Sequence, residues 1–305
     1  MRLSSLDWSD FSQRVSRKGL PIQTGPFVFR IRSAIDSVAK GLHLLYADHH
    51  LVKDETFVDF DMRMERGIGL HRWVHPQVRF VCDGGSPFKP LPISHAYPLL
   101  EWAMNWCIST QAHQYLMLHA AVIERDGLAA ILPAPPGSGK STLCAALIHR
   151  GWRLLSDEMT LISPLDGEIV PLCRPVSLKN ESLEIIRNFA PSAVFSDVVH
   201  DTSKGSVGLM KVEKHHLDRM NSTARPGWVI FPKYVADASA KLTPRSRADS
   251  MLELGRNAFN YGLLGASGFN ALAEVVDHSD CYDFEYSSLD DAVHIFDSLA
   301  TCRRS

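Results

Sequence analysis

The feature that most constrains this chain is the stretch at residues 129–142, which reads AAILPAPPGSGKST. Its apolar start predicts a short buried strand, its two glycines predict a tight loop, and its end predicts the opening of a helix. Such a loop turns backbone N–H groups inward, and the positive end of the following helix adds to the attraction for phosphate. The stretch therefore predicts a phosphate-binding loop.

The residues of this loop have expected parts in binding ATP. Lys140 is placed to reach the β- and γ-phosphates, and the Ser141 hydroxyl is the natural ligand for Mg²⁺. Ala134 stands where the G-x-x-x-x-G-K-[ST] pattern has glycine, and alanine carries the smallest penalty there, so we expect an intact loop. The expected nucleotide-binding residues are Ala134, Pro135, Pro136, Gly137, Ser138, Gly139, Lys140, Ser141 and Thr142.

An acidic pair, Asp157 and Glu158, follows the apolar segment at 152–156, which we predict to be the next strand. A helix at 141–150 separates this strand from the loop. In a right-handed β-α-β unit the C-terminal ends of both strands share one edge, so the pair would lie beside the loop. Phosphoryl transfer needs a metal and a carboxylate that orients or deprotonates the attacking hydroxyl. Asp157 is an expected metal ligand with Ser141, and either acid can be the base.

Three segments together resemble the catalytic domain of the HPr kinase/phosphorylase family: LHAA at 118–121, PGSGKS at 136–141 and RGWRLLSDE at 150–158. The resemblance implies a phosphate-contacting role for Lys140 and a metal-binding role for Ser141. It places Asp157 and Glu158 on the family's two aspartates, one of which is the general base. His119 falls on the family's active-site histidine.

Other segments set limits on the resemblance. The stretches at 174–180, 201–205 and 260–265 look like an HPr-kinase-related subfamily. The family's glutamate metal ligand lies in an IEIRG-type stretch that is not found here, and 177–185 is a rough positional counterpart. The family's later arginine loop is not evident either, which bears on the phosphorylase reaction more than on the kinase reaction. Arg174 and Lys204 are further candidates for neutralising transferred charge.

The implied fold class is α/β, with a P-loop kinase domain of the HPr kinase/PEP carboxykinase-like type at 111–305. A small α+β domain of unknown role is expected at 1–110. In it we predict a helix at 6–15, strands at 27–32, 41–46, 56–62 and 78–82, and a connecting helix at 94–110. Further along we predict a hairpin of 115–124 with 128–133, a core strand at 228–232, and helices at 249–261 and 289–299.

Composition argues against several classes of protein. A formal charge of −2 provides no basic field for nucleic acid, and no run of 18 apolar residues predicts a membrane span. The six cysteines form no C-x-x-C pair, so we expect neither a disulfide framework nor a zinc site. The N-terminus has no apolar signal segment, and we expect a cytoplasmic protein. The sequence leaves open whether the chain forms a homo-oligomer.

The sequence thus predicts an ATP- and Mg²⁺-dependent kinase that transfers the γ-phosphoryl group to a hydroxyl. By resemblance, the acceptor is a serine of a small protein or peptide. The alternatives are a switch-like ATP binder or ATPase that regulates a partner, and a small-molecule kinase. Asp157 and Glu158 distinguish the kinase from the switch-like ATP binder, because a regulatory binder has no use for a base next to an acceptor.

Overall fold

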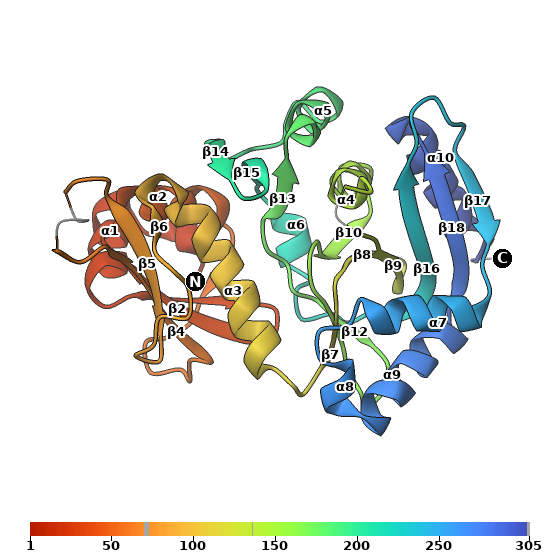
Figure 1. Cartoon of the computed structure of the whole chain (residues 1–305), viewed down its shortest axis with the longest axis horizontal. Helices are drawn as coiled ribbons and strands as arrows, with labels where there is room; N and C mark the ends of the chain where they lie inside the picture. Colours follow the sequence, from red (N-terminus) through yellow and green to blue (C-terminus); the bar gives the residue numbers. More distant parts are fainter. Residues whose placement is uncertain (70–72, 136, 304–305) are drawn as a thin grey trace.

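The computed structural model describes residues 1–69, 73–135 and 137–303, and it is a mixed α/β structure with several sheets. Figure 1 shows the elements α1 to α3, here called the N-terminal region, lying beside the rest of the chain. Pro136 of the predicted loop lies outside the described residues. None of the helices in the described part of the chain has the length and hydropathy needed to cross a bilayer.

The N-terminal region is built on a sheet with the strand order β3-β1-β2-β4-β5-β6. Its strand β2 alternates between buried and half-buried residues, as expected when one face of a sheet packs on a core and the other faces solvent. In chain order the elements are α1 (Trp8–Arg17), β1 (Leu20–Thr24), β2 (Phe27–Ser33), α2 (Asp36–Leu45), β3 (His50–Leu51), β4 (Phe60–Arg66), β5 (Gln77–Cys82), β6 (Leu91–Pro92) and α3 (Ala96–Gln111).

Two predictions for this region need correction. The strand predicted at 41–46 is wrong, because these residues belong to α2; the buried Val38, Leu42 and Leu45 recur at helical spacing, which the short window hid. The strand predicted at 56–62 begins only at Phe60, and Phe57 is exposed. The connecting helix predicted at 94–110 is confirmed as α3.

The second large sheet has the order β10-β8-β9-β16-β18-β17, with β9 and β18 parallel to the central β16. Helices α4 and α10 pack into the apolar cluster on one face, and α7 and α9 into the cluster on the other. The elements are β8 (Ala120–Arg125), β9 (Leu128–Pro133), α4 (Lys140–Ile148), β10 (Arg153–Ser156), β16 (Arg225–Tyr234), β17 (Lys241–Pro244), α7 (Arg247–Arg256), α8 (Tyr261–Leu264), α9 (Ala266–Asp277), β18 (Asp280–Tyr286) and α10 (Leu289–Cys302).

The strands that flank α4 are not neighbours, as a simple β-α-β unit would make them. Strand β8 lies between β9 and β10 and is antiparallel to both. Strands β9 and β10 therefore run in the same direction, and their C-terminal ends reach the same edge of the sheet. The prediction that the loop and the acidic pair share an edge is confirmed, although by a three-strand arrangement.

Two three-stranded sheets complete the fold, β12-β11-β7 and β13-β15-β14. The segment 116–118 belongs to the first of these, so the predicted hairpin is shorter than expected and starts at Ala120. The elements are β7 (Leu116–Leu118), β11 (Thr160–Ile162), β12 (Ile169–Val170), β13 (Val176–Lys179), α5 (Glu181–Phe189), β14 (Val199–Thr202), β15 (Gly205–Met210) and α6 (Lys214–Leu217).

The core of the N-terminal region continues across its border with the rest of the chain. Met117, Met159, Leu161, Leu172 and Leu209 are buried in the same apolar cluster as the residues of α1 to α3. A continuous apolar contact of this kind holds two parts of a chain in a fixed relation. Leu209 belongs to β15, so the N-terminal region, which lies beside the β13-β15-β14 sheet in Figure 1, shares part of its core with that sheet.

Candidate active site

The predicted phosphate loop has the backbone that such a loop requires. Gly137 and Gly139 have φ values of 88° and 86°, in the left-handed region that favours glycine. A Cβ on Gly139 would also meet the Tyr286 hydroxyl at 2.5 Å. Helix α4 begins directly afterwards at Lys140, so its first-turn amides face the loop without acceptors inside the helix.

Strands β16 and β18 hold the loop in place. The backbone N–H of Tyr234 donates to the carbonyl of Ser138 at 3.0 Å, and the Tyr286 hydroxyl donates to the carbonyl of Gly139 at 3.1 Å. Ala134 is buried and has no positive φ, so alanine is accommodated there without strain. The expectation of an intact loop is confirmed for its described residues.

Asp157 lies in a bend after β10 and is 5% exposed. One of its carboxylate oxygens, Oδ2, accepts a hydrogen bond from the backbone N–H of Ser177 at 3.1 Å. The other, Oδ1, is buried without a hydrogen-bond partner, although the Ser141 hydroxyl lies near enough to lower the pKa of the carboxyl. Burial nevertheless raises this pKa overall, against the attraction of Lys140. An unpartnered buried oxygen beside a hydroxyl fits a site for Mg²⁺, which takes oxygen ligands and keeps several from water and phosphate.

Glu158 is turned toward a different set of partners. Its Oε2 accepts a hydrogen bond from Asn105 Nδ2 at 2.6 Å, and its Oε1 lies 3.8 Å from Lys179 Nζ. Burial raises the pKa of this carboxyl, but Lys204, Lys179 and Lys140 outweigh burial and lower it. Glu158 is therefore an ionised carboxylate at neutral pH.

Lys140 is buried close to both acids. Its side chain is 8% exposed, and no ion pair within the described residues holds its ammonium group. Burial lowers its pKa, whereas Asp157 and Glu158 raise it. The charges of the loop lysine and of the acidic pair thus act directly on one another, as the sequence predicted.

His119 completes this group of residues. Its Nδ1 is 3.1 Å from the backbone carbonyl of Glu158, so Nδ1 carries the proton and donates to it. Burial and the nearby Lys140 lower its pKa to about 4. The imidazole is therefore neutral at physiological pH, with Nε2 free to accept a hydrogen bond from a ligand.

A cleft of about 510 Å³ opens on the far side of the acidic pair from the loop. Its walls come from α3 and from the β13-β15-β14 sheet, so the N-terminal region forms one side of it. Apolar and polar side chains share the lining, among them Leu99, Trp102, Asn105, Asp157, Glu158, Arg174, Lys179, Lys204 and Leu209. Arg174 and Lys204, the further candidates from the sequence, both lie here.

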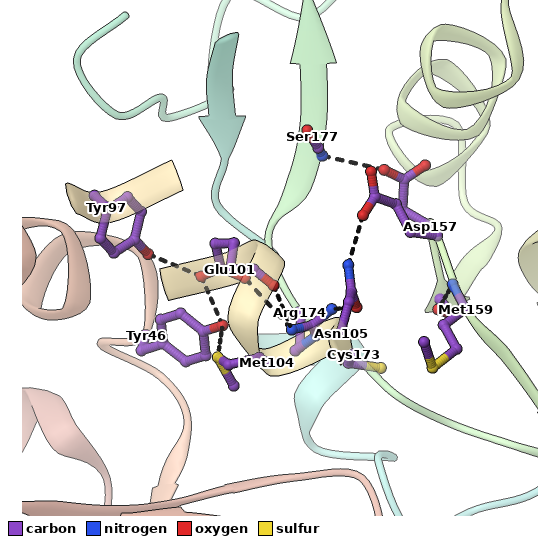
Figure 2. A network of polar contacts seen from close by, with 12 residues as sticks. Tyr46, Tyr97, Glu101, Met104, Asn105, Asp157, Met159, Cys173, Arg174 and Ser177 are labelled. Carbon is purple, nitrogen blue, oxygen red and sulfur yellow. Dashed lines mark hydrogen bonds and ion pairs between the residues drawn. The ribbon is translucent and has the colours of Figure 1, made fainter. Parts of the chain in front are cut away.

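The sequence did not reveal that α3 carries polar residues into the site. Glu101 is 8% exposed and accepts hydrogen bonds from the hydroxyls of Tyr46 and Tyr97 at 2.8 and 3.2 Å. Arg174 lies 3.7 Å from the Glu101 carboxylate and also donates to Asn105 Oδ1. Figure 2 shows the resulting chain of contacts, which runs from the tyrosines to the acidic pair. The available signal was the spacing of Glu101 and Asn105, four positions apart on a mostly apolar helix.

The remaining predicted loop residues lie at the edge of the site. The Thr142 hydroxyl donates to the Ser182 hydroxyl at 3.0 Å, and Ser138 has a buried hydroxyl without a partner. Pro135 is exposed. Across the described residues, no cluster of three or more His, Cys, Asp or Glu side chains has the arrangement of a metal site, and no disulfide joins the cysteines.

Comparisons with known proteins give limited information about this site. The family model described as SynChlorMet cassette protein ScmC matches residues 99–169, which include part of α3, the phosphate loop and the acidic pair. The match covers well under half of the chain and does not establish membership of that family. No curated protein matches the chain.

One solved structure similar to this chain is the Hpr(Ser) kinase/phosphatase from Coxiella burnetii, with a TM-score of 0.29 and 12% sequence identity. The match covers 62% of this chain and 95% of that one. A TM-score this low carries no argument about activity, so the resemblance drawn from the sequence stays a prediction. The case for function rests on the geometry of the site.

Proposed function

We propose that the chain is an ATP- and Mg²⁺-dependent phosphotransferase that transfers the γ-phosphoryl group to a hydroxyl. The first candidate for the acceptor is a serine of a small protein or peptide. The observation that carries the proposal is the placing of Glu158 and Asp157 between a phosphate loop and a cleft. The loop and Lys140 would hold the triphosphate on one side, and a hydroxyl would arrive from the other. A protein that only bound ATP would not need ionisable groups aimed at a second cavity.

The two carboxylates are suited to different roles. Ser141 and Asp157 would hold Mg²⁺, which supplies charge neutralisation for the β- and γ-phosphates. Glu158 faces the cleft and would take the proton of the hydroxyl as the new bond forms between the acceptor oxygen and the γ-phosphorus. The bond from that phosphorus to the β,γ-bridging oxygen breaks, and ADP leaves. A carboxylate with a low pKa serves here because the transition state is loose and the proton transfers late.

His119 and Lys179 would support this arrangement. The neutral imidazole presents Nε2 to a donor group of a bound ligand, while its Nδ1–H holds the backbone at Glu158. Lys179 lies beside Glu158 and offers positive charge to the transferred group. Asp157, Glu158, His119 and Lys140 are the proposed catalytic residues.

A small-molecule kinase is the second candidate. The cleft volume of about 510 Å³ is within the range of pockets that enclose small ligands. A serine on a rigid protein surface would reach Glu158 less easily than a flexible peptide or a small alcohol. The same labelling experiment distinguishes these acceptors.

The test is incubation with γ-³²P-labelled ATP, MgCl₂ and the proteins encoded beside the gene, followed by mass spectrometry of the labelled species. Label on a serine supports the proposal, and label on a small alcohol supports the second candidate. Label recovered only as inorganic phosphate, with every protein present, would contradict both and favour an ATPase switch. The Lys140→Ala variant serves as the control for contaminating kinases.

A further inference from the structure

Helix α3 of the N-terminal region touches the acidic pair directly through Asn105. Its Nδ2 donates to Glu158 Oε2 at 2.6 Å, across 53 positions of sequence. Its Oδ1 accepts a hydrogen bond from Arg174 Nη2, across 69 positions. Asn105, which Figure 2 shows beside Arg174, is thus a point at which the N-terminal region meets the proposed base.

The contact with Arg174 fixes which way the Asn105 amide faces. A guanidinium can only donate, so the oxygen of the amide must face Arg174. The NH₂ group must then face Glu158, where it can only donate to the carboxylate. Arg174 thereby prevents the amide from turning over and presenting its oxygen to Glu158.

Arg174 is itself held by the N-terminal region. It lies 3.7 Å from the Glu101 carboxylate and donates to the Glu101 backbone carbonyl at 3.4 Å. The Glu101 carboxylate in turn accepts hydrogen bonds from the hydroxyls of Tyr46 and Tyr97. A buried series of hydrogen bonds and ion pairs is rigid when all its members are paired. This series begins at Tyr46 and Tyr97 and ends at the carboxylate of Glu158.

A purely structural role, joining the two parts of the chain, explains the contacts of Glu101, Arg174 and Asn105 less well than a role in positioning Glu158. Apolar side chains of similar volume join two parts of a chain at least as well as a buried ion pair does. Leu99, Leu172 and Leu209, from both sides of this border, already belong to one buried apolar cluster. The polar chain lies where α3 approaches the acidic pair, and it ends on the Glu158 carboxylate.

We infer that Asn105 is a positioning residue that holds the Glu158 carboxylate toward the cleft, so that the N-terminal region completes the catalytic centre. The inference rests on the proposed function in that Glu158 receives the proton of the hydroxyl. It assigns to α3, in which the sequence showed no chemistry, a part in the reaction.

The first test compares Asn105→Leu with Gln111→Leu, an exposed position on the same helix. The assay is γ-phosphoryl transfer from ATP, with water as the acceptor when no other is supplied. We expect Asn105→Leu to lower kcat between about tenfold and a hundredfold because the base is misplaced, with KM for ATP changed less than about twofold. Gln111→Leu should leave both constants unchanged. Equal losses in the two variants, or a loss in KM alone, would overturn the inference.

The second test needs no activity. Unfolding midpoints in urea are measured for Asn105→Leu, Glu158→Ala and the double variant. We expect the double variant to be destabilised by less than the sum of the single variants, because both changes remove the same contact. Additive effects would overturn the inference. A wild-type protein that transfers phosphate to neither water nor any acceptor refutes the proposed function, while this cycle still decides whether Asn105 holds Glu158.

Discussion

The two sides of the acidic pair differ in how the chain builds them. On the side proposed to bind the nucleotide, here called the nucleotide side, one strand, one loop and the first turn of α4 supply the residues from Ala134 to Thr142 in a continuous stretch. On the cleft side, the contacts of Glu158 come from Asn105 and Lys179, on elements far apart in the sequence. The nucleotide side is therefore a local motif, whereas the cleft side exists only once the N-terminal region has packed against the rest.

This difference has a consequence for function. A local motif binds phosphate wherever its strand and helix form, because the amides and the helix end belong to the same few residues. A cleft formed between the N-terminal region and the rest of the chain keeps its geometry only while the contacts between these two parts persist. Changes on the nucleotide side should therefore weaken ATP binding, and changes on the cleft side should alter transfer and stability together.

The largest effect is expected from Lys140→Ala, on the nucleotide side. Removing the buried ammonium should weaken Mg²⁺–ATP binding and lower turnover by about a hundredfold or more, since it removes the main charge that meets the phosphates. Isothermal titration with ATP measures this, with Lys233→Ala, an exposed lysine, as the control. Wild-type ATP affinity in the Lys140→Ala variant would show that the loop does not bind the triphosphate.

A second prediction concerns the cleft side, where Arg174→Met leaves Glu101 buried without its cation. We expect a loss of about 3–5 kcal/mol in the free energy of unfolding, because an unpaired buried carboxylate must remain charged or take up a proton. Arg14→Met removes a solvent-exposed pair with Asp54 and should cost less than about 1 kcal/mol. Urea unfolding of both variants measures the difference. Equal costs would mean that the polar chain does not hold the two regions together.

A third prediction concerns the effect of pH on the contact between the N-terminal region and the rest of the chain. His49 is fully buried, its Nε2 lies 3.1 Å from the carbonyl of Cys173, and burial lowers its pKa to about 4. The folded chain binds this proton more weakly than the unfolded chain does, whose ordinary histidine pKa is about 6.5. Stability is therefore full above about pH 6.5 and falls as the pH drops toward 4, by about 3 kcal/mol.

Substitution separates this contribution from other titrating groups. His49→Gln keeps a donor for the Cys173 carbonyl and should make the fall in unfolding temperature between pH 6.5 and pH 4 smaller, while the half-buried His119 and the buried His216 still contribute to it. His294→Gln, at an exposed site on α10, should leave the fall unchanged. If both variants keep the wild-type slope, the acid sensitivity lies elsewhere.

The sequence predicted the loop backbone and its place beside the acidic pair because these signals are short. The glycines at 137 and 139, the helix start at Lys140 and the position of the acids after β10 all depend on a few neighbouring residues. It did not predict that β8 inserts between β9 and β10, because strand order depends on pairing between distant segments. It also missed α2, where a six-residue apolar window fits a strand as well as a helix.

The cleft side was predicted only in part, because Arg174 and Lys204 were candidates from the sequence whereas the part of α3 in the site was not expected. Asn105 and Glu101 look like ordinary polar interruptions of an amphipathic helix until Arg174 is brought against them. Their partners, Arg174 and Glu158, lie 53 or more positions further along the chain, and no local motif connects them. One side of the candidate site is therefore formed by α3, in the N-terminal region, to which the sequence assigned no role.

The most direct test of the account is the rate of a single turnover in Glu158→Gln, measured as transfer of the γ-phosphoryl group from saturating Mg²⁺–ATP. The account predicts a rate lower by about a hundredfold or more with unchanged ATP affinity, since glutamine keeps the size of the side chain and cannot accept the proton. Transfer at the wild-type rate would contradict it.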